Sequence, residues 1–103
     1  MAEKNTGQCF LGAWEEQLRK MDELGIPTAR MRKQAQEWGG VEAARRCLDG
    51  RRCSDGFSAL REKKRLELSL EALTLKSAFG TLFTDDEVNE AIRRLMEADY
   101  SFR

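Results

Sequence analysis

The sequence predicts an all-α protein, folded as a compact bundle of four to five short helices. Apolar residues recur at intervals of three and four along most of the chain, which is the spacing of one helix face. Only residues 66–70 alternate between apolar and polar side chains, so a strand there would have no partner. With 103 residues and one proline, the chain is expected to form a single helical domain over residues 1–103, with residues 1–8 as a flexible arm.

Two helices are predicted in the first third of the chain, over residues 10–24 and 28–38. The first has a narrow apolar seam formed by Leu11, Trp14, Leu18 and Met21. Gly25 and Pro27 follow it, as expected just beyond a helix end. Thr28 is expected to cap the second helix. The buried face of that helix is predicted to consist of Met31, Ala35 and Trp38.

Two shorter helices follow, predicted over residues 41–48 and 54–63. Gly39 and Gly40 interrupt the helical pattern before the first of them. Its buried residues are predicted to be Val41, Ala44 and Leu48. Ser54 is expected to cap the second of them. That helix should direct Phe57 and Leu60 inward.

Residues 66–70 are open to two interpretations, extended or helical. Three leucines alternate with Glu67 and Ser69, which mimics a strand, although the spacing from Leu70 onward suits a helical turn. We expect an extended approach and then a short helix near residues 70–76, with Ser69 as its cap. Gly80 should permit a sharp turn in the apolar corner that follows, which consists of Phe79, Leu82 and Phe83.

The clearest helix is predicted over residues 85–98. Thr84 and Glu87 have the spacing of a capping box, in which each side chain binds the other residue's backbone N–H. The apolar stripe comprises Val88, Ala91, Ile92, Leu95 and Met96. Arg93 and Arg94 are placed on the opposite face. The core is therefore predicted to contain Trp14, Leu18, Met31, Trp38, Leu48, Phe57, Leu60, Leu73, Phe79, Phe83, Ile92 and Leu95.

Several kinds of chemistry are excluded by the residues present. The chain has no histidine, which removes histidine general bases and histidine metal ligands. It has three cysteines, one fewer than a zinc site made of cysteine alone normally uses. Cys47 is interpreted as a small core residue, with a thiol activated by neighbouring arginines as the alternative. We expect a protein that is not an enzyme and that has no catalytic residues, metal or cofactor.

The compartment is predicted from three features. An odd number of cysteines without the spacing of a disulfide framework indicates reduced thiols in a cytoplasm. No apolar run is long enough to cross a bilayer, so no membrane association is expected. The first residues are polar and do not resemble a signal peptide.

Charge is distributed unevenly along a chain whose net charge is zero. Residues 28–65 carry eleven basic and five acidic side chains, a net charge of +6, whereas residues 1–27 and 66–103 carry −2 and −4. One interpretation is that the basic and acidic surfaces meet inside the fold or between subunits. The other is a basic patch for an anionic partner.

The second interpretation places a partner-binding site on Arg32, Arg45, Arg46 and Arg52. It requires the helices over residues 28–38 and 41–48 to present these arginines on one face. The partner is then another protein, bound without catalysis; the oligomeric state is not defined by the sequence. Nucleic acid is the alternative partner, bound by a helix-turn-helix that presents Arg45 and Arg46 to the major groove. The zero net charge and the shortness of the second helix weigh against that alternative.

A resemblance to known proteins rests on the segments GGVEAARRCL, SDGFSAL and RLELSLEALTLKSAFGTLFTDDEVNEAIRRLMEADY. They are similar to a small family of uncharacterised bacterial helical proteins, over about residues 26–100. The resemblance implies a bacterial, cytoplasmic protein whose gene is associated with mobile DNA. Its motifs are core and capping patterns, so it implies no catalytic residue.

Overall fold

The structure is a computed structural model that describes residues 6–50 and 52–100. In chain order its helices are α1 (Thr6–Glu23), α2 (Ala29–Trp38), α3 (Gly40–Asp49), α4 (Phe57–Glu62), α5 (Leu70–Thr74) and α6 (Asp85–Glu97). Two 3₁₀ turns, η1 (Leu66–Leu68) and η2 (Ser77–Phe79), flank α5. The described residues contain no strand, and the all-α class is confirmed. They form six α-helices rather than four to five.

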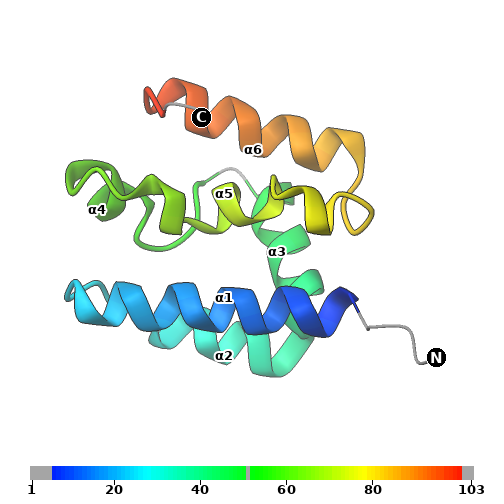
Figure 1. The fold of residues 1–103 in the computed structure, drawn as a ribbon, viewed down its shortest axis with the longest axis horizontal. Coiled ribbons are helices and arrows are strands. Elements are labelled where there is room, and N and C mark those ends of the chain that lie inside the picture. Colours follow the sequence, from blue (N-terminus) through cyan, green and yellow to red (C-terminus); the bar gives the residue numbers. More distant parts are fainter. Residues whose placement is uncertain (1–5, 51, 101–103) are drawn as a thin grey trace.

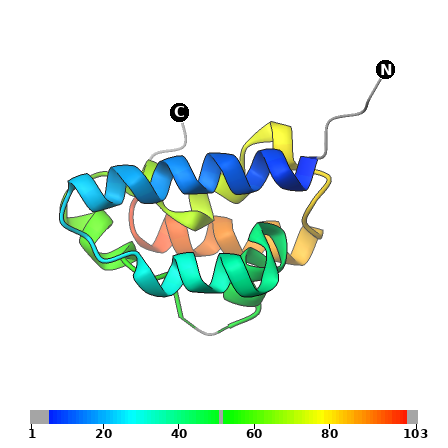
Figure 2. The ribbon, with the colours of Figure 1, turned by 90° about the horizontal axis from the view of Figure 1, so that it is seen from below.

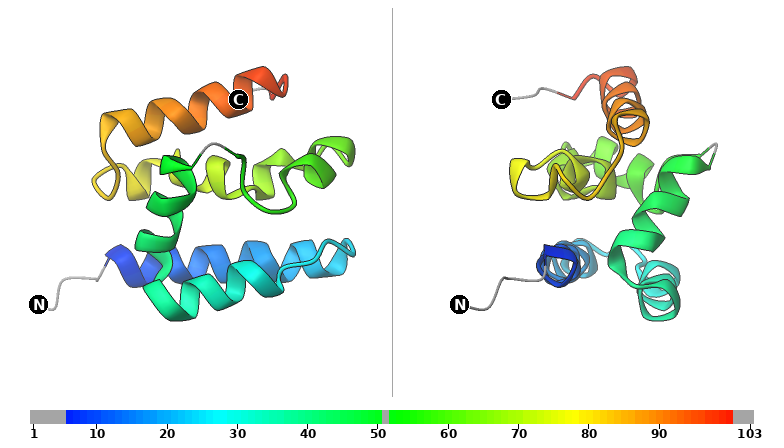
Figure 3. Two further views of the ribbon diagram at one scale, coloured as in Figure 1. Left: turned by 180° about the vertical axis from the view of Figure 1, so that it is seen from behind. Right: turned by 90° about the vertical axis from the view of Figure 1, so that its right-hand side faces the viewer.

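The helices are arranged in three tiers (Figure 1). α1 and α2 lie side by side in one outer tier (Figure 2), α4 and α5 form the middle tier, and α6 forms the other outer tier. α3 crosses the tiers and contacts α1, α2, α5 and α6. The segment that joins α3 to α4 lies on the same side of the molecule as α3 (Figure 3). This side carries the candidate site described below.

The core is built around α1. Phe10, Trp14, Leu18 and Met21 are each at most 2% exposed. The ring of Phe10 meets the rings of Phe79 and Phe83 edge-on, with centroids 5.2 and 5.3 Å apart. The predicted apolar corner is therefore present, and it packs against the first helix of the chain.

The start of α1 differs from the expected flexible arm. The helix begins at Thr6, so residues 6–8 are helical, whereas residues 1–5 lie outside the described part of the chain. Gly25 ends this region with a φ of +79°, the left-handed conformation expected of a residue just beyond a helix. Leu11 is only partly buried, and Gln17, at 7% exposure, is on the inner face of α1.

Helix caps are predicted correctly where the hydrogen-bond partner of the capping side chain lies within a few residues in the sequence. Thr84 and Glu87 form the full capping box, and Ser69 accepts a hydrogen bond from the backbone N–H of Ala72 at the start of α5. Thr28 and Ser54 are different: Thr28 stands at the N-cap position of α2 but its side chain makes no capping hydrogen bond, and Ser54 does not cap α4. The hydroxyl of Thr28 donates to Asp22, and the hydroxyl of Ser54 donates to Glu71. α4 consequently begins later than predicted, at Phe57.

Two backbone predictions between α4 and α6 are wrong. The extended approach over residues 66–70 is a 3₁₀ turn, η1, followed directly by α5. Its three leucines are all buried, so the alternation does not separate an inner from an outer face. Gly80 has φ −61° and ψ −24°, a right-handed conformation open to any residue, so the turn does not depend on glycine there.

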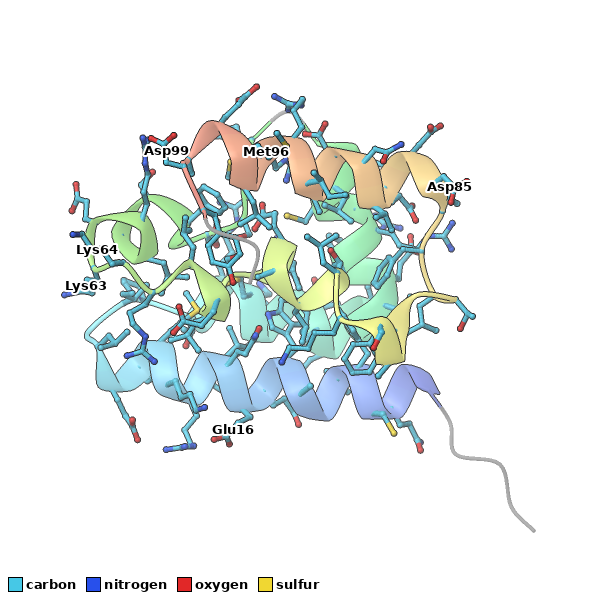
Figure 4. The ribbon with its side chains drawn as sticks, turned by 45° about the horizontal axis from the view of Figure 1, so that its top comes forward. Glu16, Lys63, Lys64, Asp85, Met96 and Asp99 are labelled. Carbon is cyan, nitrogen blue, oxygen red and sulfur yellow. The ribbon has the colours of Figure 1, made fainter. Side chains whose placement is uncertain are left out.

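Two predicted core residues are not buried. Trp38 is 39% exposed at the end of α2, and Ile92 of α6 is half-buried. The inner face of α6 is rotated from the prediction and consists of Glu87, Ala91, Arg94 and Leu95. Arg94, predicted on the outer face, is 3% exposed, whereas Met96 is 63% exposed and lies on the outer tier (Figure 4). The remaining ten predicted core residues are buried.

Candidate interaction groove

A groove of about 440 Å³ lies between α2, α3, Gly50 and residues 52–55. Its floor includes side chains that are almost fully buried, namely Trp14, Met31, Ala43 and Leu70. Its rim carries Arg30 from the first turn of α2, Arg46 from α3 and Arg52 from the segment after α3. Asp55 is the one carboxylate among the described residues that line it.

On the rim of the groove, the side chains of Arg46 and Trp38 contact each other. The guanidinium carbon of Arg46 lies 4.2 Å from the centroid of the Trp38 ring, within the range of a cation–π contact. The Nε of Arg46 donates to Glu42, 3.0 Å away, one turn earlier on α3. Its two terminal nitrogens make no hydrogen bond to a described residue. The arginine therefore covers part of the exposed Trp38 ring.

The other two arginines on the rim make fewer contacts with described residues than Arg46 does. Arg30 is 71% exposed, and its Nε lies 3.9 Å from a carboxylate oxygen of Asp55. Arg52 is exposed and forms no ion pair with a described residue. Arg51, the neighbour that the sequence also assigns to the basic segment, lies outside the described residues.

A buried ion pair positions the wall of the groove that carries Arg52. Arg94 of α6 and Glu71 of α5 are 3% and 0% exposed, and Arg94 Nη1 lies 3.0 Å from Glu71 Oε2. Arg94 Nη2 donates to three carbonyl oxygens at the end of α3, those of Cys47, Leu48 and Gly50. Glu71 accepts hydrogen bonds from the backbone N–H and the hydroxyl of Ser54. The segment is thus anchored on both sides of Arg52.

The sequence analysis does not identify this pair, although the chain carries a signal for it. Glu71 interrupts the apolar run from Leu70 to Leu73, and Arg94 is followed directly by buried Leu95. Burial opposes the charge on Arg94, but hydrogen bonds to Glu90 and Glu71 outweigh it and raise the pKa of the guanidinium. Opposite charges set inside two apolar segments are the pattern expected when the two are paired in a core.

The structure brings only two of the four predicted site residues to the groove, Arg46 and Arg52. Arg32 lies elsewhere and donates to the carboxylate of Asp22 and to the hydroxyl of Thr28. Hydrogen bonds from Thr28 and Arg32 lower the pKa of Asp22. The basic charge of Arg32 in α2 is therefore balanced by an acid from the end of α1.

Arg45 also lies away from the groove and points toward α6. Its Nε is 3.0 Å from a carboxylate oxygen of Glu87, whose side chain is 8% exposed. Burial raises the pKa of Glu87, but hydrogen bonds from Thr84 and Arg45 outweigh burial and lower it. This pairing across the fold is the arrangement in which basic and acidic segments meet inside the molecule.

Two thiols line the groove without the properties of a reactive cysteine. Burial and the nearby carboxylate of Glu71 raise the pKa of Cys47 to about 12, even though Arg94 lies 3.8 Å from its sulfur. Burial also raises the pKa of Cys53. The neighbouring arginines therefore do not produce a thiolate at neutral pH. Among the described residues, no three Cys, Asp or Glu side chains converge as metal ligands.

The geometry of α2 and α3 departs from a helix-turn-helix. One residue, Gly39, separates the two helices, whereas the turn of a DNA-binding motif has three or four. The outer face of α3 carries Glu42 and Asp49 beside Arg45 and Arg46. Two acids on that face would approach the phosphates of a bound duplex. The arrangement suits an open groove better than insertion of α3 into DNA.

No protein-family model matches this chain, no curated protein matches it in sequence, and no solved structure matches it in fold. None of the described helices combines the length and the apolar character that crossing a bilayer requires.

Proposed function

We propose that this chain is a non-enzymatic interaction protein that binds an acidic segment of another protein in the groove between α2, α3, Gly50 and residues 52–55. The observation that carries the proposal is the convergence of Arg30, Arg46 and Arg52 beside the half-exposed ring of Trp38. Tryptophan and arginine are the residues most enriched at the energetic centres of protein interfaces. The groove is preformed, because Arg94 and Glu71 anchor its wall.

We place this function in the cytoplasm of a bacterium. The three cysteines are free and are not arranged as a disulfide framework, which supports a reducing compartment. The bacterial source rests on the resemblance of residues 26–100 to a family of bacterial helical proteins.

Acrylamide quenching of tryptophan fluorescence tests the proposal directly. Trp14 is 1% exposed and Trp38 is 39% exposed, so quenching by a neutral solute reports mainly on the groove. A glutamate-rich peptide should protect Trp38 from quenching, and the protection should weaken as salt is added. A DNA duplex of random sequence, added at equal charge, should protect less.

Two pairs of charge-reversal variants test whether binding depends on the groove or on the net charge of the protein. Arg46→Glu with Arg52→Glu should abolish protection while the helical circular dichroism remains, because exposed substitutions usually change stability little. Arg61→Glu with Lys63→Glu makes the same change in charge around the end of α4, away from the groove (Figure 4). The second pair should leave protection intact. Equal loss in both pairs, or protection by DNA alone, would reject the proposal.

A further inference from the structure

We infer that the groove binds one carboxylate together with an adjacent apolar side chain more tightly than it binds a run of negative charges. The inference rests on the proposed function and narrows the class of partner. It follows from the local charge of the groove, the orientation of Arg46 and the position of Trp38.

The local charge is small. Three arginines reach the rim, but Glu42 pairs with Arg46 and Asp55 lies beside Arg30. The net charge of these five side chains is +1, with Arg52 unpaired among the described residues. A polyanion would bring several negative charges to a site whose net charge is +1. A single carboxylate matches the charge that is available.

Arg46 is oriented to receive that carboxylate. Its Nε is occupied by Glu42, and its guanidinium lies over the Trp38 ring, so two contacts fix the position of the group. The two terminal nitrogens are left without a hydrogen bond to a described residue. A planar arginine held in this way can bind both oxygens of a carboxylate with two parallel hydrogen bonds.

Trp38 supplies the apolar half of the site. It is one of two large hydrophobic side chains that are exposed in the described part of the chain; the other is Met96, on α6. Because Trp38 contacts Arg46, a bound carboxylate lies next to the uncovered part of the indole ring. An aromatic or aliphatic side chain beside the carboxylate would cover that surface. The occupant is therefore a segment in which Asp or Glu neighbours an apolar residue.

Three synthetic peptides of equal length test this inference against the full chain by calorimetry. The first contains phenylalanine next to a single glutamate, the second has serine in place of the phenylalanine, and the third has glutamine in place of the glutamate. The first peptide should bind about tenfold or more tightly than either of the others, the loss expected when a central interface residue is removed.

Single-residue variants of the protein test the carboxylate-binding half and the apolar half of the site separately. Arg46→Lys keeps the charge but loses the planar fork, and Trp38→Ser removes the ring; each should weaken the first peptide about tenfold or more. Arg45→Lys and Met96→Ser are the controls, because neither residue lines the groove, and both should leave binding unchanged. The losses from Trp38→Ser and from the serine peptide should not add, because they remove the same contact.

The outcomes separate this inference from the proposed function. If the glutamate-rich peptide binds through Arg46 and Arg52 but the phenylalanine adds no affinity, the proposed function stands and the inference is wrong. If neither peptide binds in the groove, both are wrong. Equal effects of Arg46→Lys and Arg45→Lys would also overturn the inference, because they would show that the planar fork has no special role.

Discussion

Replacement of Arg94 with methionine should destabilise the fold more than any other single change of an arginine among the described residues. Its side chain is 2% exposed and forms ion pairs with Glu71 and Glu90. It also donates to three carbonyl groups at the end of α3. Methionine replaces the aliphatic part of the side chain but ends before the terminal nitrogens, so the main loss is that of the buried ion pairs and hydrogen bonds.

The magnitude follows from what remains after the substitution. Glu71 is 0% exposed and keeps two hydrogen bonds from Ser54, but it has lost its buried counter-charge. Breaking a buried ion pair by removing one partner costs roughly 3–5 kcal/mol. For a domain of this size, each kcal/mol lowers the melting temperature by about 4–8 °C. The variant should therefore melt roughly 12–40 °C below the parent protein.

Arg93→Ala is the matched control. Arg93 is the adjacent residue on the same helix and also forms two ion pairs, with Glu90 and Glu97, but its side chain is 52% exposed. Exposed pairs contribute at most about 1 kcal/mol, so this variant should melt close to the parent. The assay is urea and thermal unfolding followed by circular dichroism at neutral pH. A similar small loss in both variants would refute the reasoning, because burial would then not decide the value of the pair.

Four further predictions concern single residues. Thr84→Ala should cost about 1 kcal/mol in urea unfolding, because it removes the hydroxyl that caps α6; no change would show that the capping box contributes nothing. Phe83→Ala should cost roughly 3–5 kcal/mol, because Phe83 is 7% exposed and packs on Phe10; an unchanged melting temperature would contradict this. Cys47 should react with a thiol reagent much more slowly than the exposed Cys9 near neutral pH, since its pKa is raised to about 12; equal rates would contradict this. Arg93 and Arg94 hold the pKa of Glu90 at about 2, below its usual value of 4.5. The contribution of Glu90 to the free energy of unfolding is therefore complete above pH 4.5 and is lost as the pH falls toward 2. Glu90→Gln should reduce this loss of stability when unfolding is measured across the same pH range.

Local chemistry explains which features of the fold the sequence predicts well. The Thr84 cap, the Ser69 cap and the Gly25 helix end each involve residues within one turn of the chain. Their hydrogen bonds form whatever the rest of the molecule does. The predicted boundaries of α6, which carries the Thr84 cap, lie within one residue of the observed ones, and so do those of α2 and α3.

Long-range partners explain the failures. Thr28 and Ser54 have the same capping chemistry as Thr84, but their hydroxyl groups donate to Asp22 and Glu71, and the oxygen of Thr28 accepts from Arg32. Asp22 lies six residues from Thr28 and Glu71 lies seventeen residues from Ser54, so neither contact is visible in a local pattern. Each of these side chains is directed toward a partner outside the first turn of the helix that follows it.

The rotation of α6 has a related cause. Ala91 and Leu95 belong both to the predicted apolar stripe and to the buried face that the structure shows. The prediction completes that face with Val88, Ile92 and Met96, whereas the structure completes it with Glu87 and Arg94, which pair with Arg45 and Glu71. Periodicity locates the helix, whereas its orientation depends on charges supplied by α3 and α5.

The candidate site shows why charge summed along the sequence overstates the basic character of the surface. Of the arginines in the middle segment, Arg32 pairs with an acid from α1 and Arg45 pairs with an acid from α6. Both acids belong to the segments that the sum counts as negative, so folding joins the charges that the sequence separates. The field that remains around Arg46 and Arg52 is short in range, since their unpaired charge is small and is screened within about 8–10 Å in physiological salt. Such a site has little power to steer a polyanion from a distance, and its selectivity has to come from contact, through the fork of Arg46 and the ring of Trp38.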